Sequence, residues 1–557
     1  MGSGGQAEIT VGTDGNLYRY LEEYVLAYVR VGILYQFGWH RRSYRLLSLF
    51  IKDKGLFYIQ FTKNIKINQR RKKMYTPVYD EINRYKDYDV IPVSREIYAD
   101  IITPITLLRK IADKYKNFYL LESIEGGEKW ARYSFFGFDP KARLYCKDGT
   151  VTIEGEGANV IKTEKPLEVL REYISHYKTP TFKGNPPFTG GLVGYYGYSM
   201  IGYAEPTLKL KSSEFNDFDV MLCDKIIAYD HLKQKITVIV NMKTTDMKAQ
   251  YEKAVRDIEE IVNMINDPTP SSKLSAYSNV SFQSNFSEEE YANTVEKTKE
   301  YIFNGDIFQA VISRRFETPY EGSLLNAYRV LRVTNPSPYM VFMKIGENEI
   351  ISTSPETLVR YQNGRLTTFP IAGSRPRGKT EQEDLALEKD LLQDEKELSE
   401  HNMLVDLGRN DLGKISKFNS VEVTKYMQIL RYSKIMHICS EVQSDAKDDV
   451  DAFDAIESVL PAGTLSGAPK VRACEIIEEL EKCPRGIYGG AIGYVDFNGN
   501  MDTCIAIRMA SKIKDKVYVQ AGGGIVADSI PHNEYMESHN KALAVMNAIK
   551  NAGEVDR

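Results

Sequence analysis

The sequence predicts an α+β fold with a large antiparallel component. Helical and strand patterns follow one another through residues 286–552 without the regular βαβ rhythm of a doubly wound parallel sheet. Residues 224–240 have the pattern of two strands around a turn, which is typical of an antiparallel hairpin. No internal repeat is present, so a solenoid or propeller is not indicated.

The elements of the first half follow in order. Residues 102–116 have helical spacing of apolar side chains, residues 116–123 and 142–153 have strand character, and residues 247–265 predict a helix. Residues 266–285 are rich in Pro, Ser and Asn and predict a linker. We therefore expect an N-terminal region at 74–265 and a C-terminal region at 286–552.

Residues 1–73 differ in composition from the rest of the chain. They open with MGSGG, are rich in Tyr, Phe, Leu and Arg, and end in a basic run at 70–73 directly before Met74. We predict a leader or tag-like extension that is not part of the main fold. A targeting peptide is the alternative, although such peptides are usually rich in Ser and this segment is not.

The bulk composition is that of an ordinary soluble globular protein, with 557 residues, 43% hydrophobic and 27% charged. The net charge of −4 gives no electrostatic reason to expect nucleic-acid binding. No apolar run reaches the roughly 18 residues of a membrane span. The six cysteines lie far apart without a C-x-x-C pair, so we expect reduced thiols and a cytoplasmic protein.

Two pairs of glutamates stand at helical spacing. Glu397 and Glu400 lie in a predicted helix at 381–407, and Glu534 and Glu537 repeat the spacing in a second predicted helix, so each pair shares one helix face. Converging carboxylates would suit Mg²⁺, which prefers oxygen ligands. The alternative, which spacing alone favours, is that both pairs are solvated helix faces.

A run of glycines follows the predicted strand 516–519. Gly522, Gly523 and Gly524 allow a ligand to approach the backbone closely, and free N–H groups in a turn would form a nest for an anion. An ordinary tight turn or bulge is the alternative. The spacing is not that of a dinucleotide-binding loop.

Two further features suit an anionic ligand, and a lone histidine stands apart from them. Thr464 and Ser466 precede a helix that Pro469 begins, although ordinary capping is the alternative. The predicted strand 501–510 carries one cation, Arg508, which needs an anionic partner if it is buried, from a ligand or from the protein. His437 stands in an apolar context and, taken alone, indicates a structural histidine.

Four segments resemble, in order and wording, the chorismate-utilising enzymes. They are EKELSEHNMLVDLGRND at 395–411, PIAGSRPRG at 370–378, PAGTLSGAPKVRA at 461–473 and QAGGGIVADS at 520–529. The resemblance covers about residues 74–552. It implies an α/β sandwich of two large, mainly antiparallel sheets flanked by helices, in which the N-terminal and C-terminal segments pack together.

The resemblance also implies roles for individual residues. Glu400 and Glu537 match the principal magnesium ligands, with Glu397 and Glu534 as supporting carboxylates. The groups that match the substrate-carboxylate contacts are Tyr488, Arg508, Gly522, Gly523 and Gly524. Thr464 and Ser374 match further substrate contacts, although many relatives have Thr where this chain has Ser374. His437 matches the histidine near the departing enolpyruvyl group, and Glu356 matches the general acid for the 4-hydroxyl.

Two positions separate the branches of the family. Enzymes that add water have a lysine base where this chain has Gln309, and aminodeoxychorismate synthases have a lysine nucleophile where it has Ala372. The resemblance therefore implies the large subunit of an anthranilate synthase. This enzyme converts chorismate and ammonia to anthranilate and pyruvate, the first committed step of tryptophan biosynthesis. The chain has no nucleophilic-cysteine motif for glutamine hydrolysis, so a partner glutamine amidotransferase subunit is expected. An aminodeoxyisochorismate or aminodeoxychorismate synthase, or a non-catalytic homologue, is the alternative.

The resemblance extends to a second, regulatory site. Residues 120–123 resemble one half of the family's tryptophan-binding motif, and residues 335–340 resemble the other. The implied contacts are Glu122, Ser123, Asn335, Pro336, Ser337, Pro338, Tyr339 and Met340. We expect feedback inhibition by tryptophan, with Glu122 near the ligand ammonium and the prolines forming a rigid wall. The alternative is a simple strand end and turn.

Overall fold

The computed structural model describes residues 48–51, 55–58, 74–123, 132–272, 280–432 and 435–555. The chain divides into two compact units, Met1–Arg70 and Arg71–Arg557. In the first unit, β1 (Ser48–Ile51) and β2 (Gly55–Tyr58) form an antiparallel hairpin. The rest of the predicted leader at 1–73 lies outside the described residues, so its independence of the main fold stays a prediction.

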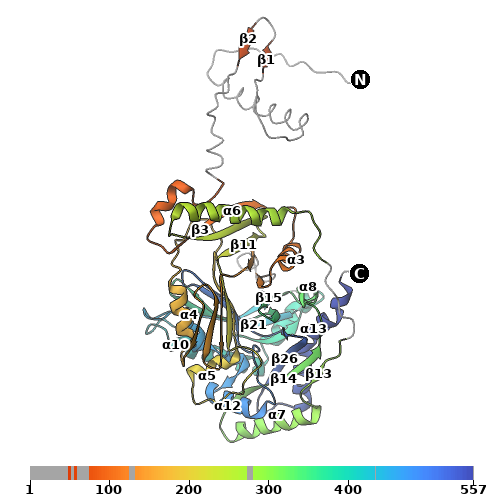
Figure 1. The fold of residues 1–557 in the computed structure, drawn as a ribbon. Coiled ribbons are helices and arrows are strands. Elements are labelled where there is room, and N and C mark those ends of the chain that lie inside the picture. Colours follow the sequence, from red (N-terminus) through yellow and green to blue (C-terminus); the bar gives the residue numbers. More distant parts are fainter. Residues whose placement is uncertain are drawn as a thin grey trace, which may run out of the picture. The chain divides into compact units, whose positions relative to one another are not determined.

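Two sheets of twelve antiparallel strands each make up the centre of the described part of the second unit (Figure 1). Sheet I runs β19 (Ile371–Pro376), β21 (Ile435–Asp445), β18 (Arg365–Thr368), β17 (Thr357–Gln362), β24 (Met501–Ile505), β23 (Ala491–Asp496), β9 (Gly191–Tyr196), β10 (Phe218–Cys223), β6 (Ala142–Lys147), β7 (Thr150–Gly155) and β8 (Asn159–Lys162), with β20 (Glu422–Arg431) paired to β21. Sheet II runs β13 (Gln283–Ser284), β14 (Gln309–Pro319), β26 (Lys516–Ile525), β25 (Met509–Ile513), β16 (Asn348–Ser354), β15 (Tyr339–Ile345), β4 (Phe118–Glu122), β5 (Tyr133–Phe138), β11 (Lys225–Asp230), β12 (Lys235–Lys243) and β3 (Val90–Tyr98), with β22 (Gly467–Ala468) paired to β14.

Both halves of the chain contribute strands to both sheets. In sheet I, β9 from the N-terminal half pairs with β23 from the C-terminal half. In sheet II, β4 pairs with β15 in the same way. The regions 74–265 and 286–552 therefore share one core, as the family resemblance implies, and neither sheet is complete without the other region.

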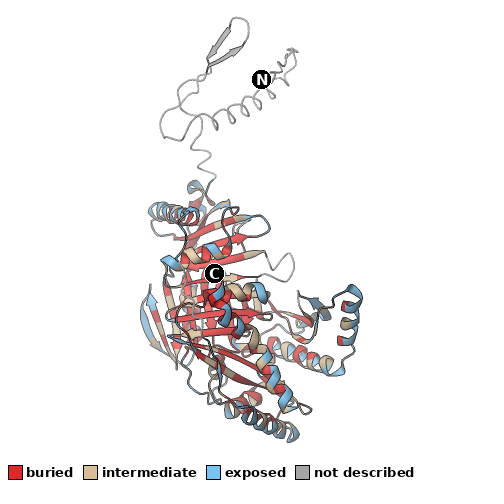
Figure 2. Ribbon diagram, turned by 90° about the vertical axis from the view of Figure 1, so that its right-hand side faces the viewer, coloured by how far each residue is buried: buried red, intermediate tan, exposed pale blue. Residues whose placement is uncertain are grey.

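Helices cover the outer faces of the two sheets, and Figure 2 shows their exposed surfaces over largely buried strands. Those on sheet II are α3 (Pro104–Lys114), α6 (Met247–Asn266), α8 (Leu325–Thr334) and α13 (Pro531–Lys550), with α7 (Glu288–Phe303) and α12 (Lys470–Leu480) near β14. Those on sheet I are α4 (Pro166–Ser175), α9 (Glu381–Leu391), α10 (Glu395–Gly413) and α11 (Ala452–Val459), with α5 (Ile201–Ala204) next to α11. The short 3₁₀ helices are η1 (Tyr79–Tyr85), η2 (Tyr198–Met200), η3 (Gly463–Leu465) and η4 (Asn551–Glu554).

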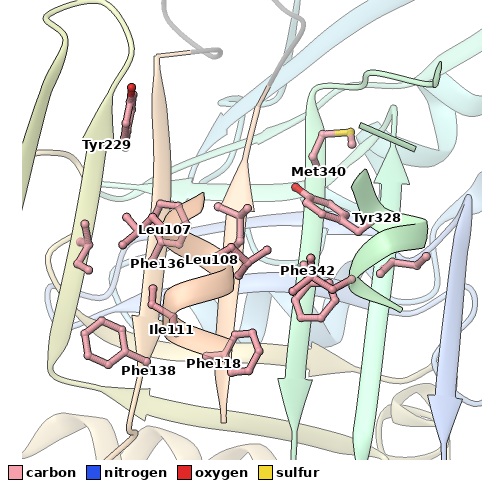
Figure 3. Close-up of a cluster of buried hydrophobic side chains, with 14 of the residues drawn as sticks. Leu107, Leu108, Ile111, Phe118, Phe136, Phe138, Tyr229, Tyr328, Met340 and Phe342 are labelled. Atoms are coloured by element: carbon pink, nitrogen blue, oxygen red, sulfur yellow. The ribbon is translucent and has the colours of Figure 1, made fainter. Parts of the chain in front are cut away.

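The packing of α3 illustrates how a helix is fixed on a sheet. Thr103 caps the helix by accepting from the amide of Thr106 at 3.2 Å, and Pro104 occupies its first turn. The buried face of α3 consists mainly of Leu107, Leu108 and Ile111, which lie against the phenylalanines of β4 and β5 (Figure 3). Each fully buried side chain of this kind stabilises the fold by about 1.5–3 kcal/mol.

The structure confirms most predicted elements and corrects three. The predicted helix 381–407 is two helices, because Asp394 accepts from the amides of Lys396 and Glu397 and starts α10 afresh. The predicted strand 501–510 is β24 and β25, which belong to different sheets. Gly522–Gly524 are part of β26 and pair with residues 311–313 of β14, so the expected turn and anion nest are wrong.

No helix within the described ranges combines the length and apolar character that a bilayer crossing needs.

Candidate active site

The two glutamate pairs lie on α10 and α13, one helical turn apart within each pair. The Ser529 hydroxyl donates to Glu534 Oε1 at 2.8 Å, whereas Glu534 Oε2 is buried without a hydrogen-bond partner. Such an orphaned carboxylate oxygen is costly unless a cation or water meets it.

Glycines make room for these carboxylates. A Cβ on Gly523 would lie 2.8 Å from Glu534 Oε2 and 3.6 Å from the Glu537 carboxyl carbon. A Cβ on Gly373, whose φ is +68°, would lie 3.1 Å from Glu397 Oε2. The glycine run thus lets α13 carboxylates approach the strand, which is a different role from the predicted anion nest.

Within each pair the two carboxyls influence one another electrostatically, and a lysine of α10 acts on the α13 pair. Burial, and then the neighbouring Glu400, raise the pKa of Glu397. Burial raises the pKa of Glu534 as well; Glu537 adds to this, whereas Ser529 and Lys396 of α10 oppose it. The influence of an α10 lysine on an α13 carboxyl indicates that the pairs lie near one another.

The carboxylates fit a magnesium ion. In the ranges that the structure describes, no three His, Cys, Asp or Glu side chains already enclose a metal position. Magnesium needs only one or two protein carboxylates and keeps water or substrate oxygens in the rest of its shell. The buried, unpartnered Glu534 Oε2 is the oxygen that this requirement predicts.

Arg508 lies where the chain crosses from sheet I to sheet II, with a φ of +48°. The prediction of an arginine inside a strand is therefore wrong, whereas a bound carboxylate as its partner stays a prediction. Its guanidinium donates to the Lys541 carbonyl at 2.9 Å and forms no ion pair with any carboxylate of the described residues. Burial lowers its pKa, while Tyr488 and Glu537 oppose this shift. Arg508 thus retains donors for an anion.

Lys541 was missed by the sequence analysis. Its ammonium lies 2.6 Å from Glu537 Oε1 and donates to the Gly522 carbonyl at 3.1 Å. The i,i+4 spacing after Glu537 is the signal that could have found it. Tyr488 is buried nearby; burial raises its pKa to about 12, and the charges of Arg485 and Arg508 partly oppose this.

Glu356 is a buried acid. The Thr464 hydroxyl donates to Glu356 Oε1 at 3.2 Å. Burial raises the pKa of Glu356 to about 8, against the opposing effects of Thr464 and Lys541. The carboxyl therefore carries its proton at neutral pH, which is the state that a general acid requires.

His437 stands opposite Ser374 in the pairing of β21 with β19. Its Nδ1 lies 2.9 Å from the Gly373 carbonyl, so Nδ1–H donates and Nε2 is left as an acceptor. Burial lowers the pKa of His437; the Gly373 contact opposes this shift and Arg508 adds to it. The ring is therefore neutral, with Nε2 available as an acceptor.

Gln309 begins β14 and is 3% exposed. Its amide nitrogen lies 1.9 Å from where a Cβ on Gly524 would be, and its Oε1 has no hydrogen-bond partner. Ala372 lies in β19 without any polar group. Neither position provides a base or an amine.

A separate cavity of about 380 Å³ lies beside the predicted regulatory residues. Five of these residues line it: Glu122, Ser123, Pro338, Tyr339 and Met340. The opposite wall comes from residues 492–494 and 500–502 and Cys504. Asn335, Pro336 and Ser337 do not line this cavity. The structure therefore brings together most, but not all, of the predicted regulatory set.

The expected role of Glu122 is not supported. Its side chain is fully buried and accepts hydrogen bonds from Tyr328 at 2.6 Å, Arg332 at 2.7 Å and Ser134 at 3.1 Å. These donors occupy the carboxylate, so it holds the wall of the cavity together and does not offer a free partner to a ligand ammonium.

Comparison with known proteins agrees with this geometry. The model of the chorismate binding enzyme family matches residues 116–547. Anthranilate synthase component 1 of Acetivibrio thermocellus is 47% identical, over 86% of this chain and 100% of that protein. The same component of Pseudomonas aeruginosa is 44% identical, over 83% and 96%.

Solved structures also match this chain. Anthranilate synthase component I from Streptococcus pneumoniae superposes with a TM-score of 0.69 at 37% identity, covering 81% of this chain and 98% of that one. The menaquinone-specific isochorismate synthase from Escherichia coli, at 16% identity and a TM-score of 0.61, shares the fold. The chain therefore belongs to the chorismate binding enzyme family, and within it to the anthranilate synthase component 1 proteins.

Proposed function

We propose that this chain is the large subunit of an anthranilate synthase, which converts chorismate and ammonia to anthranilate, pyruvate and water. One observation carries the proposal: the site holds a protonated acid in Glu356 but a neutral amide at Gln309. An amide cannot activate water, whereas ammonia is already a nucleophile.

Substrate binding would use the cationic side of the site. Arg508, Tyr488 and Lys541 are donors for the two carboxylates of chorismate. Glu400 and Glu537, with Glu397 and Glu534 beside them, would hold the magnesium ion. When bound, the ion neutralises charge on a substrate carboxylate and orients the ring.

The chemical steps then follow from Glu356 and His437. The ammonia nitrogen bonds to C2 as the C4–O bond breaks, and Glu356 gives its proton to the departing oxygen, which leaves as water. The nitrogen, which enters as an ammonium group, gives up one proton. The C2 proton is then removed and the C3–O bond to the enolpyruvyl group breaks, which forms the aromatic ring. The departing enolate takes up a proton at its methylene carbon and becomes pyruvate. The free Nε2 of His437 is the acceptor that we assign to this second stage.

A partner glutamine amidotransferase subunit would supply the ammonia. Burial suppresses the cysteine thiols of this chain; it raises the pKa of Cys439 to about 12 and that of Cys483 to about 11. No activated thiolate is therefore at hand among the described residues to hydrolyse glutamine. Phe308 and Met536, which are 74% and 40% exposed beside Gln309 and Glu537, are apolar groups that a partner would cover.

Feedback inhibition by tryptophan would act at the 380 Å³ cavity. The Tyr339 hydroxyl there bonds to Asp502 at 2.7 Å and to the Thr357 hydroxyl at 2.9 Å, and Thr357 is the neighbour of the acid Glu356. A ligand that moves Tyr339 would therefore disturb the acid. By reciprocity, chorismate would weaken tryptophan binding by the same factor.

The test is mass spectrometry of the products from purified chain, chorismate, ammonium and Mg²⁺. We expect anthranilate and pyruvate in equal amounts. An aminated product that keeps its enolpyruvyl group would show an aminodeoxyisochorismate or aminodeoxychorismate synthase instead. No conversion with ammonium, in a protein that unfolds cooperatively, would show a non-catalytic homologue.

A further inference from the structure

A small cavity lies between the acid Glu356 and helix α10. Its volume is about 40 Å³, and it is lined by Glu356 and Thr464 as well as by Asp411 of α10. At 10–15 Å³ for each water position, the cavity has room for about three or four water molecules. Apolar side chains, including Leu404, form much of the remaining wall.

Asp411 is a buried carboxylate with one oxygen that lacks a hydrogen bond. The residue is 3% exposed, and its Oδ2 accepts from the Lys470 ammonium at 2.7 Å. Its Oδ1 is buried without a hydrogen-bond partner. Because such a group is rarely left unmet in a native protein, water in the adjoining cavity is its natural partner.

Asp411 is also connected to solvent. The Lys414 ammonium lies 3.6 Å from Asp411 Oδ1, and the Lys414 side chain is 50% exposed. Lys470 is held in place from the other side, since it also donates to the Val459 carbonyl at 2.8 Å. One carboxylate therefore stands between an exposed ammonium and a cavity that ends at Glu356.

We propose that Asp411 and water in this cavity form a proton relay that returns a proton to Glu356 after each turnover. The inference rests on the proposed role of Glu356 as the acid. Once Glu356 has lost its proton to the departing oxygen, the Lys414 ammonium gives a proton to the Asp411 carboxylate, Asp411 passes it to a cavity water, and that water protonates Glu356. Lys414 then regains a proton from bulk water.

The charges around the relay suit this exchange. Burial raises the pKa of Asp411, and Lys470 and Lys414 oppose the shift. Burial also raises the pKa of Glu356, where Thr464 and Lys541 oppose it.

The first test compares Asp411→Asn with Asp406→Asn, using ammonium as the nitrogen source. Asp406 lies on the same helix, but its side chain is 73% exposed and pairs with Arg409. For Asp411→Asn we expect kcat to fall by roughly tenfold or more, with KM for chorismate unchanged and a larger solvent deuterium isotope effect. Asp406→Asn should behave as the original protein in all three measurements.

The second test fills the cavity without touching a titratable group. Gly408 lines the cavity, and an added Cβ would lie 3.2 Å from Thr368 Cγ2. Gly408→Ala should lower kcat while cooperative unfolding is kept, because the added methyl takes space from the cavity and Ala is readily accommodated in a helix. Gly413→Ala in the same helix meets no atom within 4 Å and is the matched control.

The outcomes separate the relay from the function on which it rests. If Asp411→Asn has the kcat and the isotope effect of the original protein, the relay is wrong. The relay is also wrong if the variant has a lower kcat, a changed KM and a lower stability but the isotope effect of the original protein. If Asp411→Asn does not fold, Gly408→Ala decides, and full activity there overturns the relay. A failure of the proposed function looks different, because the original protein then forms no anthranilate or Glu356→Gln keeps full activity.

Discussion

Replacing the acid Glu356 with Gln should make the protein less active and more stable at the same time. Gln keeps the shape of the protonated carboxyl and accepts from Thr464, but it has no acidic proton to give. Loss of a general acid slows such a reaction by about 10²–10⁴-fold.

The stability change follows from the pKa. Burial raises the pKa of Glu356 from 4.5 to about 8. A carboxyl shifted in this direction contributes most to stability below pH 4.5, and the contribution is lost as the pH rises to about 8. At pH 7 the unfolded chain is ionised while the folded chain is protonated, which destabilises the fold by up to about 3 kcal/mol. At pH 5 the same effect is under about 1 kcal/mol.

Urea unfolding at pH 5 and pH 7 measures this difference, and anthranilate fluorescence at saturating free ammonia measures the rate. The advantage of Glu356→Gln in the free energy of unfolding should grow from pH 5 to pH 7. The kcat of the original protein should fall as the pH rises through about 8, and the variant should lack this limb. An equal stability difference at both pH values, or an alkaline limb kept by the variant, would refute the assignment.

Three further predictions concern other parts of the molecule. Glu400→Gln and Glu537→Gln should each abolish Mg²⁺-dependent turnover with the fold intact, whereas Glu395→Gln, on an exposed position of α10, should not; near-normal activity of either variant in trace Mg²⁺ would contradict the metal assignment. Ser123→Phe should occupy the 380 Å³ cavity and remove inhibition by tryptophan in a titration near half-saturating chorismate; a variant that stays fully sensitive would exclude this site. Deletion of residues 2–73 should leave activity and cooperative unfolding unchanged, and an inactive or insoluble product would show that the segment packs on the main fold.

The sequence alone determined the elements that depend on near neighbours. The apolar spacing of α3 and α6 and the glutamate pairs of α10 and α13 follow from contacts three or four residues apart. The long motifs were sufficient to identify the family, and the family model that matches residues 116–547 confirms this. Periodicity did not resolve the break at Asp394, because a cap at that position interrupts an otherwise continuous helical pattern.

Only the tertiary structure decided what each group faces. The alternating pattern of the neighbouring residues predicts that Arg508 lies in a strand. In the structure the chain passes from sheet I to sheet II at this position. Gly523 serves the carboxylate of Glu534, which is near it only because α13 packs on β26. The Glu122 carboxylate accepts from Arg332, 210 residues away. Asp411 lines one cavity with Glu356 and Thr464, which lie in distant parts of the sequence. Burial and pairing with residues far apart in the sequence determine the pKa of a side chain and which of its lone pairs are free. These contacts cannot be predicted from the neighbouring residues alone.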